Sequence, residues 1–333
     1  MPSRGRLIKI LVGLAVSAAL LVYFFWDVDL RAVAARLRET RWSFLAFCAA
    51  LNVLALWLRA WRWYYLYPPG TRPSHLFNAT MIGYMANNLL PLRAGELVRI
   101  YVASRRGQRF WTTVATLVVE RVLDALAVGL TVVVLLLVVP FPREMRWSAF
   151  LFMAVDLIAM VVLAVIAVAP GACAGVIRAL FSRWRWVERR LLDILSTMSE
   201  GLRGIRSGRH LAPVLLSSVG IWLVLALAVW AAFQSARLAL PLTAAWTVLA
   251  FLGLGVSLPS SPGFVGVVQA ATVLALDIFG VPRSDALSVS ILLHAAQFIP
   301  VTLLGLALLL VEHVSLGEAT RAAGAAASPP PAL

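Results

Sequence analysis

The chain of 333 residues carries little charge and almost no lysine, Lys9 being the single example. Charged residues make up 13% of the sequence, whereas soluble domains carry about 25%. Hydrophobic residues reach 62%, and the mean hydropathy is +0.90. Because so few polar side chains cannot cover the surface of a soluble globule, the composition predicts an integral membrane protein.

Cysteine and histidine are also scarce, with two and four residues. Cys48 and Cys173 lie far apart without metal or redox spacing, and each histidine is isolated in the sequence. We therefore expect neither a disulfide nor a bound metal. The sequence contains no Walker motif, so we do not expect a process driven by ATP hydrolysis, and no cofactor is predicted.

Acidic residues number 15 against 29 basic ones, which gives a formal charge of +14. In a membrane protein such an excess marks cytoplasmic loops and anionic lipid surfaces. Membrane lipids are therefore the predicted partners, and nucleic acid is not. Residues 171–210 contain eight arginines and three acids, so this loop is predicted to be cytoplasmic, together with both termini.

Long apolar segments predict an all-α, polytopic membrane protein with six spans. Arg4, Arg6 and Lys9 precede the first of them as in a signal peptide, but no cleavage site follows, so we expect a retained anchor. A single transmembrane domain is predicted over residues 1–312, with a disordered tail over 313–333. The six spans are Ile10–Trp26, Trp42–Arg59, Thr113–Val139, Trp147–Ala169, Leu211–Phe233 and Ala286–Val311.

Two further segments are predicted to lie at the membrane surface: the loop over residues 171–210 and the end of the second span. Apolar residues recur at helical spacing in the cytoplasmic loop, which predicts an amphipathic helix on the inner leaflet; a solvated arm is the alternative. The stretch from Trp57 to Pro69 is typical of an interfacial belt of aromatics and arginines, and we expect it to anchor the second span. The recurring loop residues are Leu180, Trp184, Val187, Leu191 and Leu195.

Two apolar stretches do not fit as full spans and predict opposed re-entrant hairpins over residues 75–109 and 242–280. One is too short and the other is interrupted by Pro and Gly, and each contains the pattern L-P-x-x-x-G. On the predicted topology the hairpins open to opposite sides, which indicates an inverted repeat with a substrate site between them. Kinked ordinary helices are the alternative. The pattern residues are Leu90, Pro91 and Gly95, then Leu258, Pro259 and Gly263.

The two interruptions contain residues suited to an anion. Ser260 and Ser261 before Pro262 predict a helix start, whose positive end favours phosphate. Arg93 would supply a charge-assisted contact from the other hairpin. Glu96 and Arg99 follow on one helical face and could line the path or only pair with each other. We predict that Arg93, Ser260, Ser261 and Gly263 bind a lipid phosphate.

Charged residues within the third predicted span form a second group. Glu120, Arg121 and Asp124 share a short stretch, and such groups normally face a cavity or pair with one another. Glu120 could pair with Arg93 or Arg99, and Asp124 could carry a proton or meet a cationic head group. A purely structural network explains Glu120 and Arg121 equally well.

Other polar residues are candidates for the cavity wall or for ties between helices. Asp156 is a further candidate with no visible partner. The complete predicted set of lining or gating residues is Asn88, Pro91, Gly95, Glu96, Arg99, Glu120, Arg121, Asp124, Pro259, Pro262, Gln269, His294 and Gln297.

Three motifs in this order resemble the flippase-like membrane domain of lysylphosphatidylglycerol synthases and its stand-alone relatives. They are "NNLLPLRAGELVR" at Asn87–Arg99, "ERVLD" at Glu120–Asp124 and "LPSSPGFVGVVQ" at Leu258–Gln269. The resemblance spans about Ile10 to Val311 and implies movement of a polar-headed lipid between leaflets. Lysyl transfer is not carried over, because a short low-complexity tail stands where two-domain members have a soluble aminoacyltransferase. Relatives associated with hopanoid, glycolipid or polyprenyl-phosphate pathways leave the lipid open.

The expected function is therefore that of a flippase or scramblase-like transporter in the bacterial inner membrane, without enzymatic activity. One alternative is a membrane transferase using a lipid-linked sugar, with Glu96 or Asp29 as its catalytic carboxylate. Another is a non-transporting subunit of a lipid or hopanoid biosynthetic complex. The oligomeric state is left open, with a homodimer as one possibility.

Overall fold

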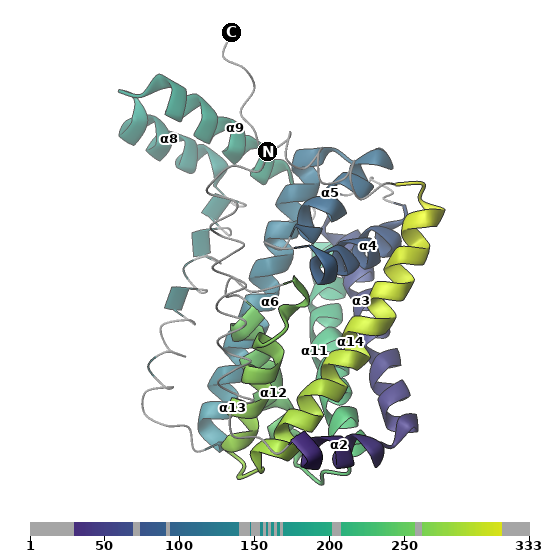
Figure 1. The fold of residues 1–333 in the computed structure, drawn as a ribbon. Helices are drawn as coiled ribbons and strands as arrows, with labels where there is room; N and C mark the ends of the chain where they lie inside the picture. Colours follow the sequence, from purple (N-terminus) through teal and green to yellow (C-terminus); the bar gives the residue numbers. More distant parts are fainter. Residues whose placement is uncertain are drawn as a thin grey trace.

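The computed structural model describes residues 30–68, 74–90, 94–139, 169–201, 208–256 and 262–314, with scattered positions between 147 and 166. All regular elements in these ranges are helices (Figure 1). In chain order they are α2 (Leu30–Arg38), α3 (Trp42–Leu66), α4 (Leu76–Leu89), α5 (Gly95–Arg105), α6 (Phe110–Val138), α8 (Pro170–Phe181), α9 (Arg185–Gly201), α11 (Gly208–Ser235), α12 (Leu242–Val256), the 3-10 turn η2 (Pro262–Phe264), α13 (Val267–Asp277) and α14 (Arg283–Val311).

Four described helices are long and apolar enough to cross a membrane: α3, α6, α11 and α14. They contain 25 to 29 residues and confirm four of the predicted spans. The chain is therefore a multi-pass membrane protein. The predicted span Ile10–Trp26 lies outside the described residues, and so does most of Trp147–Ala169, including Asp156. Asp29 and residues 315–333 are outside them as well.

Helix α3 corrects the prediction of an interfacial belt. It continues past Arg59 to Leu66 and presents two different faces. Trp57 and Trp61 are exposed on one face, whereas Arg59 and Arg62 are buried on the other. The prediction was wrong for the arginines because positions three apart share one face of a helix, and here that face points into the protein.

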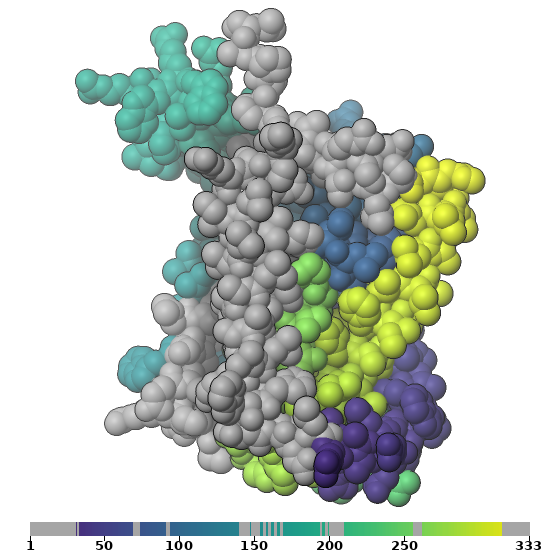
Figure 2. All heavy atoms as spheres, in the orientation of Figure 1, coloured from purple at the N-terminus to yellow at the C-terminus, as the bar shows by residue number. Residues whose placement is uncertain are grey.

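Two pairs of short helices, α4–α5 and α12–α13, enter the molecule from opposite ends (Figure 1). Each helix has 11 to 15 residues, so each is about 17–23 Å long and shorter than the apolar core of a bilayer, about 30 Å. The pairs meet half way along the molecule, beside α14 (Figure 2). A Cβ built on Gly263 would lie 3.2 Å from the carbonyl oxygen of Asn88, so the two tips touch.

The tip of the second pair differs from the predicted helix start at Pro262. Pro262–Phe264 form a single 3-10 turn, and α13 begins five residues later at Val267. Gly263 and Gly266 have φ values of +68° and +86°, which only glycine adopts freely. These conformations interrupt the helix, so the expected α-helix from Pro262 is wrong.

The loop that was predicted to be cytoplasmic, residues 171–210, also differs from the prediction of one amphipathic helix. It consists of α8 and α9, which lie side by side and extend away from the other helices (Figure 1). A turn closed by the bond from Trp184 N–H to the Phe181 carbonyl, at 2.8 Å, separates them. Leu180 and Trp184 are exposed, whereas Leu195 is buried, where α9 contacts α6.

Glu312, just beyond α14, ties this helix to α4 and α5. Asn78 donates to its Oε1 at 2.6 Å, Arg106 donates to its Oε2 at 2.8 Å, and His75 Nδ1 lies 3.1 Å from Oε1. Burial alone would raise the pKa of Glu312, but the hydrogen bonds from Asn78 and Arg106 outweigh it and hold the pKa below the ordinary 4.5.

We expect the contribution of Glu312 to stability to be lost in acid. A lowered pKa in the folded state means that the contribution is complete above pH 4.5 and fades as the pH falls through the folded value. Thermal unfolding in detergent should show a wild-type advantage over Glu312→Gln at neutral pH that narrows below pH 4.5. A difference that stays constant through this range would contradict the assignment.

Candidate functional site

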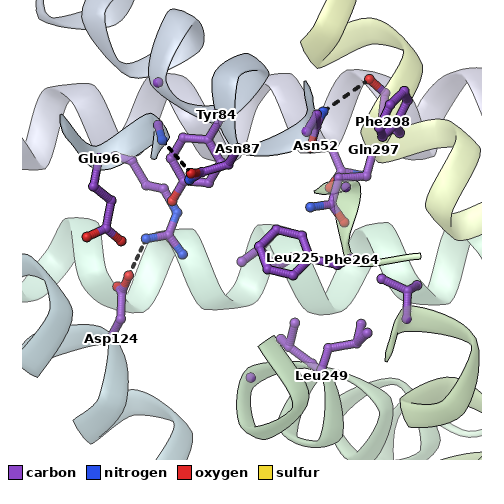
Figure 3. Close-up of a pocket in the computed structure, with 18 of the residues that line it drawn as sticks. Asn52, Tyr84, Asn87, Glu96, Asp124, Leu225, Leu249, Phe264, Gln297 and Phe298 are labelled. Atoms are coloured by element: carbon purple, nitrogen blue, oxygen red, sulfur yellow. Dashed lines mark hydrogen bonds and ion pairs between the residues drawn. The ribbon is translucent and has the colours of Figure 1, made fainter. Parts of the chain in front are cut away.

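A cavity of about 510 Å³ lies where the tips of the two short helix pairs meet (Figure 3). Ligand sites commonly have volumes of roughly 300–1,000 Å³ and combine apolar walls with a few polar groups. The polar lining residues are Asn52, Arg59, Tyr84, Asn87, Asn88, Glu96, Arg99, Arg121, Asp124, His294 and Gln297. The apolar ones include Val128, Trp222, Leu225, Leu249, Leu252, Phe264, Val268 and Phe298.

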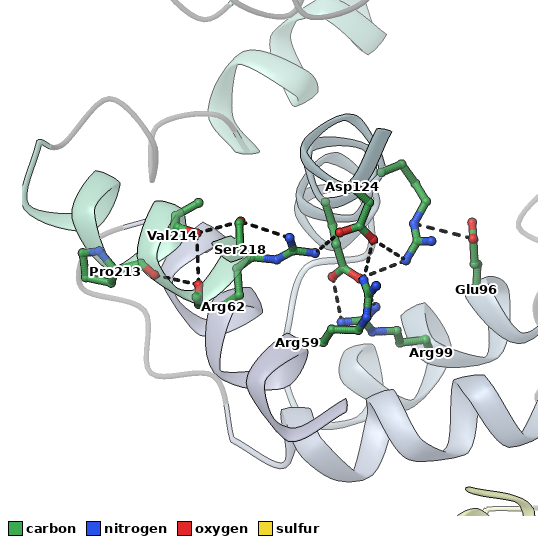
Figure 4. Close-up of polar contacts among 11 residues, drawn as sticks. Arg59, Arg62, Glu96, Arg99, Asp124, Pro213, Val214 and Ser218 are labelled. Carbon is green, nitrogen blue, oxygen red and sulfur yellow. Dashed lines mark hydrogen bonds and ion pairs between the residues drawn. The ribbon is translucent and has the colours of Figure 1, made fainter. Parts of the chain in front are cut away.

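Asp124 is held at the cavity wall by two arginines of α3 (Figure 4). Arg62 Nη2 donates to its Oδ1 at 2.7 Å, and Arg59 Nη1 donates to its Oδ2. Arg62 is fully buried and also donates to Ser218 Oγ of α11 at 3.1 Å. Helices α3, α6 and α11 are thus joined by one charged network, which fixes the position of the Asp124 carboxylate.

Glu120, one turn before Asp124, is paired with Arg99 of α5. Two hydrogen bonds of 2.9 Å join the guanidinium to the two carboxylate oxygens. The Arg99 guanidinium also lies 3.8 Å from the ring centroid of Trp63, where a cation–π contact adds stability. The predicted pairing of Glu120 with Arg99 is confirmed, and it holds the first helix pair against α6.

Arg121 is the most open guanidinium of the cluster, with 34% of its side chain exposed. It donates to Glu120 Oε1 at 2.9 Å, and its Nε lies 3.8 Å from Glu96 Oε1. Among the described residues of this cluster, four arginines face three carboxylates. One positive charge is therefore in excess beside the cavity. The arginines are Arg59, Arg62, Arg99 and Arg121, and the acids are Glu96, Glu120 and Asp124.

Two asparagines fix the tip of the first helix pair. The amide of Asn87 accepts a bond of 2.8 Å from the Gly95 N–H, the first of α5. Asn88 Nδ2 donates to Thr302 Oγ1 at 3.0 Å and to the Phe298 carbonyl at 3.4 Å. The tip of the first pair is therefore tied to the middle of α14.

A chain of hydrogen bonds fixes the tip of the second pair to the same helix. Gly266 N–H donates to Gln269 Oε1 at 2.8 Å, and Gln269 Nε2 lies 3.1 Å from His294 Nδ1. His294 Nε2 lies 2.8 Å from the Gly263 carbonyl. Because a carbonyl only accepts, His294 carries its proton on Nε2 and accepts at Nδ1 from Gln269.

The predicted site residues divide into three groups by position. Glu120 and Gln269 were predicted to line or gate the cavity but are buried outside its lining, where each bonds to other protein groups. Pro262 lies in η2 and is also outside the lining. Pro91, Arg93, Pro259, Ser260 and Ser261 lie outside the described residues. The predicted residues that do line the cavity are Asn88, Gly95, Glu96, Arg99, Arg121, Asp124, Gly263, His294 and Gln297.

Sequence reasoning missed several polar residues of the wall. Arg59 and Arg62 were assigned to an interfacial belt, although two arginines three residues apart in an apolar helix match the two acids of α6 in number. Asn52, Tyr84 and Asn87 also line the cavity. An asparagine in the middle of the predicted second span was the signal for Asn52, because polar groups within a span normally face a cavity or a partner.

The fold and the cavity define a class: a multi-pass α-helical membrane protein with a charged cavity between two opposed pairs of short helices. Within it, the family described as "Lysylphosphatidylglycerol synthase TM region" matches residues 10–305. The chain belongs to this family, as the three motifs predicted. Family membership indicates a function related to membrane lipids. No curated protein and no solved structure matches the chain.

Proposed function

We propose that the protein is a flippase or scramblase-like transporter, which moves an anionic, phosphate-bearing lipid between the leaflets of the bacterial inner membrane. One observation carries the proposal: a cavity with an excess positive charge lies between the tips of two opposed helix pairs. The head group would cross through this cavity. Arg93 and the residues Ser260 to Gly263 would add contacts from the two tips.

The arrangement of the short helices supports a path through the membrane. Non-helical backbone at membrane depth is tolerated only where it is buried in protein or lines a watery cavity. In this proposal α4–α5 and α12–α13 are re-entrant hairpins from opposite sides of the membrane, and their irregular tips lie at its midplane. Opposed repeats with a site between their interrupted helices are typical of secondary transporters.

The charges support an anionic head group. A charged group that enters hydrocarbon without partners costs many kcal/mol, whereas Arg121 and Arg59 can replace part of its hydration at the cavity wall. Glu120 and Asp124 are each held by at least two guanidinium groups. This favours a positional role for both carboxylates over proton transfer, and hence a passive mechanism.

The test is leaflet exchange of fluorescent phosphatidylglycerol in liposomes that contain the purified protein. Wild type should accelerate exchange, and Arg121→Ala should slow it about tenfold or more, because hydrogen bonds from charged groups contribute about 1.5–3 kcal/mol each. Arg93→Ala should have a similar effect. Arg189→Ala, which changes an exposed arginine of α9 outside the cavity lining, serves as the control and should match wild type.

Two results would overturn the proposal. One is the absence of acceleration for every lipid class tried, including polyprenyl phosphates and with a proton gradient imposed. The other is full activity in both Arg121→Ala and Arg93→Ala, which would remove the cavity from the transport path.

A further inference from the structure

The cavity wall changes from charged to apolar along a single helix. On α6 the lining residues are the charged Arg121 and Asp124 and, each one turn further along the helix, the apolar Ala125 and Val128. Figure 3 shows the charged residues Glu96 and Asp124 on one side, and Leu225, Leu249 and Phe264 away from them, with the uncharged polar residues Asn52 and Gln297 near Phe264. The two sides of the cavity therefore suit two chemically different parts of a ligand.

The apolar part lies between α6, α11 and α12. A Cβ built on Gly253 of α12 would come within 2.7 Å of Val128 Cγ2, so α6 and α12 pack closely beside the cavity. Protein interiors normally fill such apolar space with their own side chains. An apolar compartment continuous with a charged one is what an amphiphile requires, because its chain and its head group then each meet a matching wall.

Trp222 adds a specific polar group to the apolar part. Its side chain lines the cavity, and the residue is 93% buried since only 7% of its surface is exposed. Its indole nitrogen is buried and has no acceptor among the described residues. Because an indole N–H only donates, the group that satisfies it must be an acceptor.

We propose that the cavity binds both the head group and one acyl chain of a lipid whose chains are ester-linked. The phosphate lies against Arg121, the start of one acyl chain enters the compartment between α6, α11 and α12, and Trp222 donates a hydrogen bond to the ester carbonyl. The proposal rests on the proposed function for the head group. It adds to that function a requirement for chains that are joined to the head group by ester bonds.

The test compares binding of diester phosphatidylglycerol with its diether counterpart of the same chain length to the full-length protein in detergent. Ether chains lack the carbonyl, so wild type should bind the diester about fivefold more tightly, the effect of one neutral hydrogen bond. Trp222→Phe keeps the aromatic packing and should bind both lipids equally. Glycerol 3-phosphate, a head group without chains, should bind far more weakly than either lipid.

A second variant tests the chain compartment independently of Trp222. Ala125→Leu adds volume to the apolar part and should weaken binding of both lipids, whereas Leu130→Phe, on the exposed face of the same helix, should leave both unchanged. Equal affinity of wild type for diester and diether would overturn the proposal. A preference that persists in Trp222→Phe would also do so, as would the absence of phosphatidylglycerol binding.

The outcomes separate this proposal from the proposed function. An ester preference that depends on Trp222, without accelerated leaflet exchange, would keep the binding mode and remove the transport role. Accelerated exchange without an ester preference would keep transport and remove the role of Trp222.

Discussion

Replacing Arg99 with alanine is expected to lower the free energy of unfolding by about 3–5 kcal/mol, the usual cost of breaking a buried ion pair by removing one partner. Glu120 is fully buried and receives two hydrogen bonds of 2.9 Å from Arg99. Without Arg99 its charge would keep one hydrogen bond, from Arg121, and the more distant Arg59 guanidinium at 4.0 Å. Chemical unfolding in detergent micelles measures the effect.

Two variants show whether the loss comes from the uncompensated charge. Arg121→Ala should cost less than Arg99→Ala, because Arg121 is 34% exposed and water can replace its contacts. Replacing Arg99 and Glu120 together with leucine should recover most of the stability, since both buried charges are then removed. If Arg99→Ala unfolded like wild type, the pair would not hold α5 against α6.

The long helices were predictable because twenty or more apolar residues leave few other structures possible in a membrane. The ends of α3 were harder to place. Trp57, Trp61 and Tyr64 fit an interfacial belt and are indeed exposed, but the arginines between them point into the protein. Sequence alone did not separate these faces, because the charged partner of Arg59 and Arg62 is Asp124, 62 residues or more away in the chain.

The candidate site was predictable where a charge had few plausible partners, as with Glu120, which was expected to pair with Arg93 or Arg99 and pairs with Arg99. It was not predictable where backbone conformation decided the outcome. Ser260, Ser261 and Pro262 have the composition of a helix start, yet the positive φ values of Gly263 and Gly266 delay α13 to Val267. Local propensity was outweighed by the contact of this tip with Asn88 and with α14.

Replacing Gly95 with alanine is the second change with a large expected effect, about 3 kcal/mol of destabilisation. A Cβ at this position would lie 1.9 Å from the Gly83 carbonyl oxygen and 2.6 Å from Asn87 Oδ1. The first of these atoms belongs to the backbone of α4 and cannot rotate away, so α4 and α5 would have to separate. Both glycines line the cavity, so lipid exchange should fall together with stability.

Gly175→Ala is the matched control, because it makes the same substitution inside α8, where a Cβ would meet no atom of the described residues within 4 Å. It should leave exchange unchanged and raise stability by roughly 0.5–1 kcal/mol, the usual gain for alanine over glycine within a helix. Thermal unfolding and leaflet exchange of the two variants, measured side by side, decide the question. A Gly95→Ala protein as stable and as active as Gly175→Ala would show that α4 and α5 can separate without cost, and that the close packing of this pair does not position Glu96 and Arg99 at the cavity.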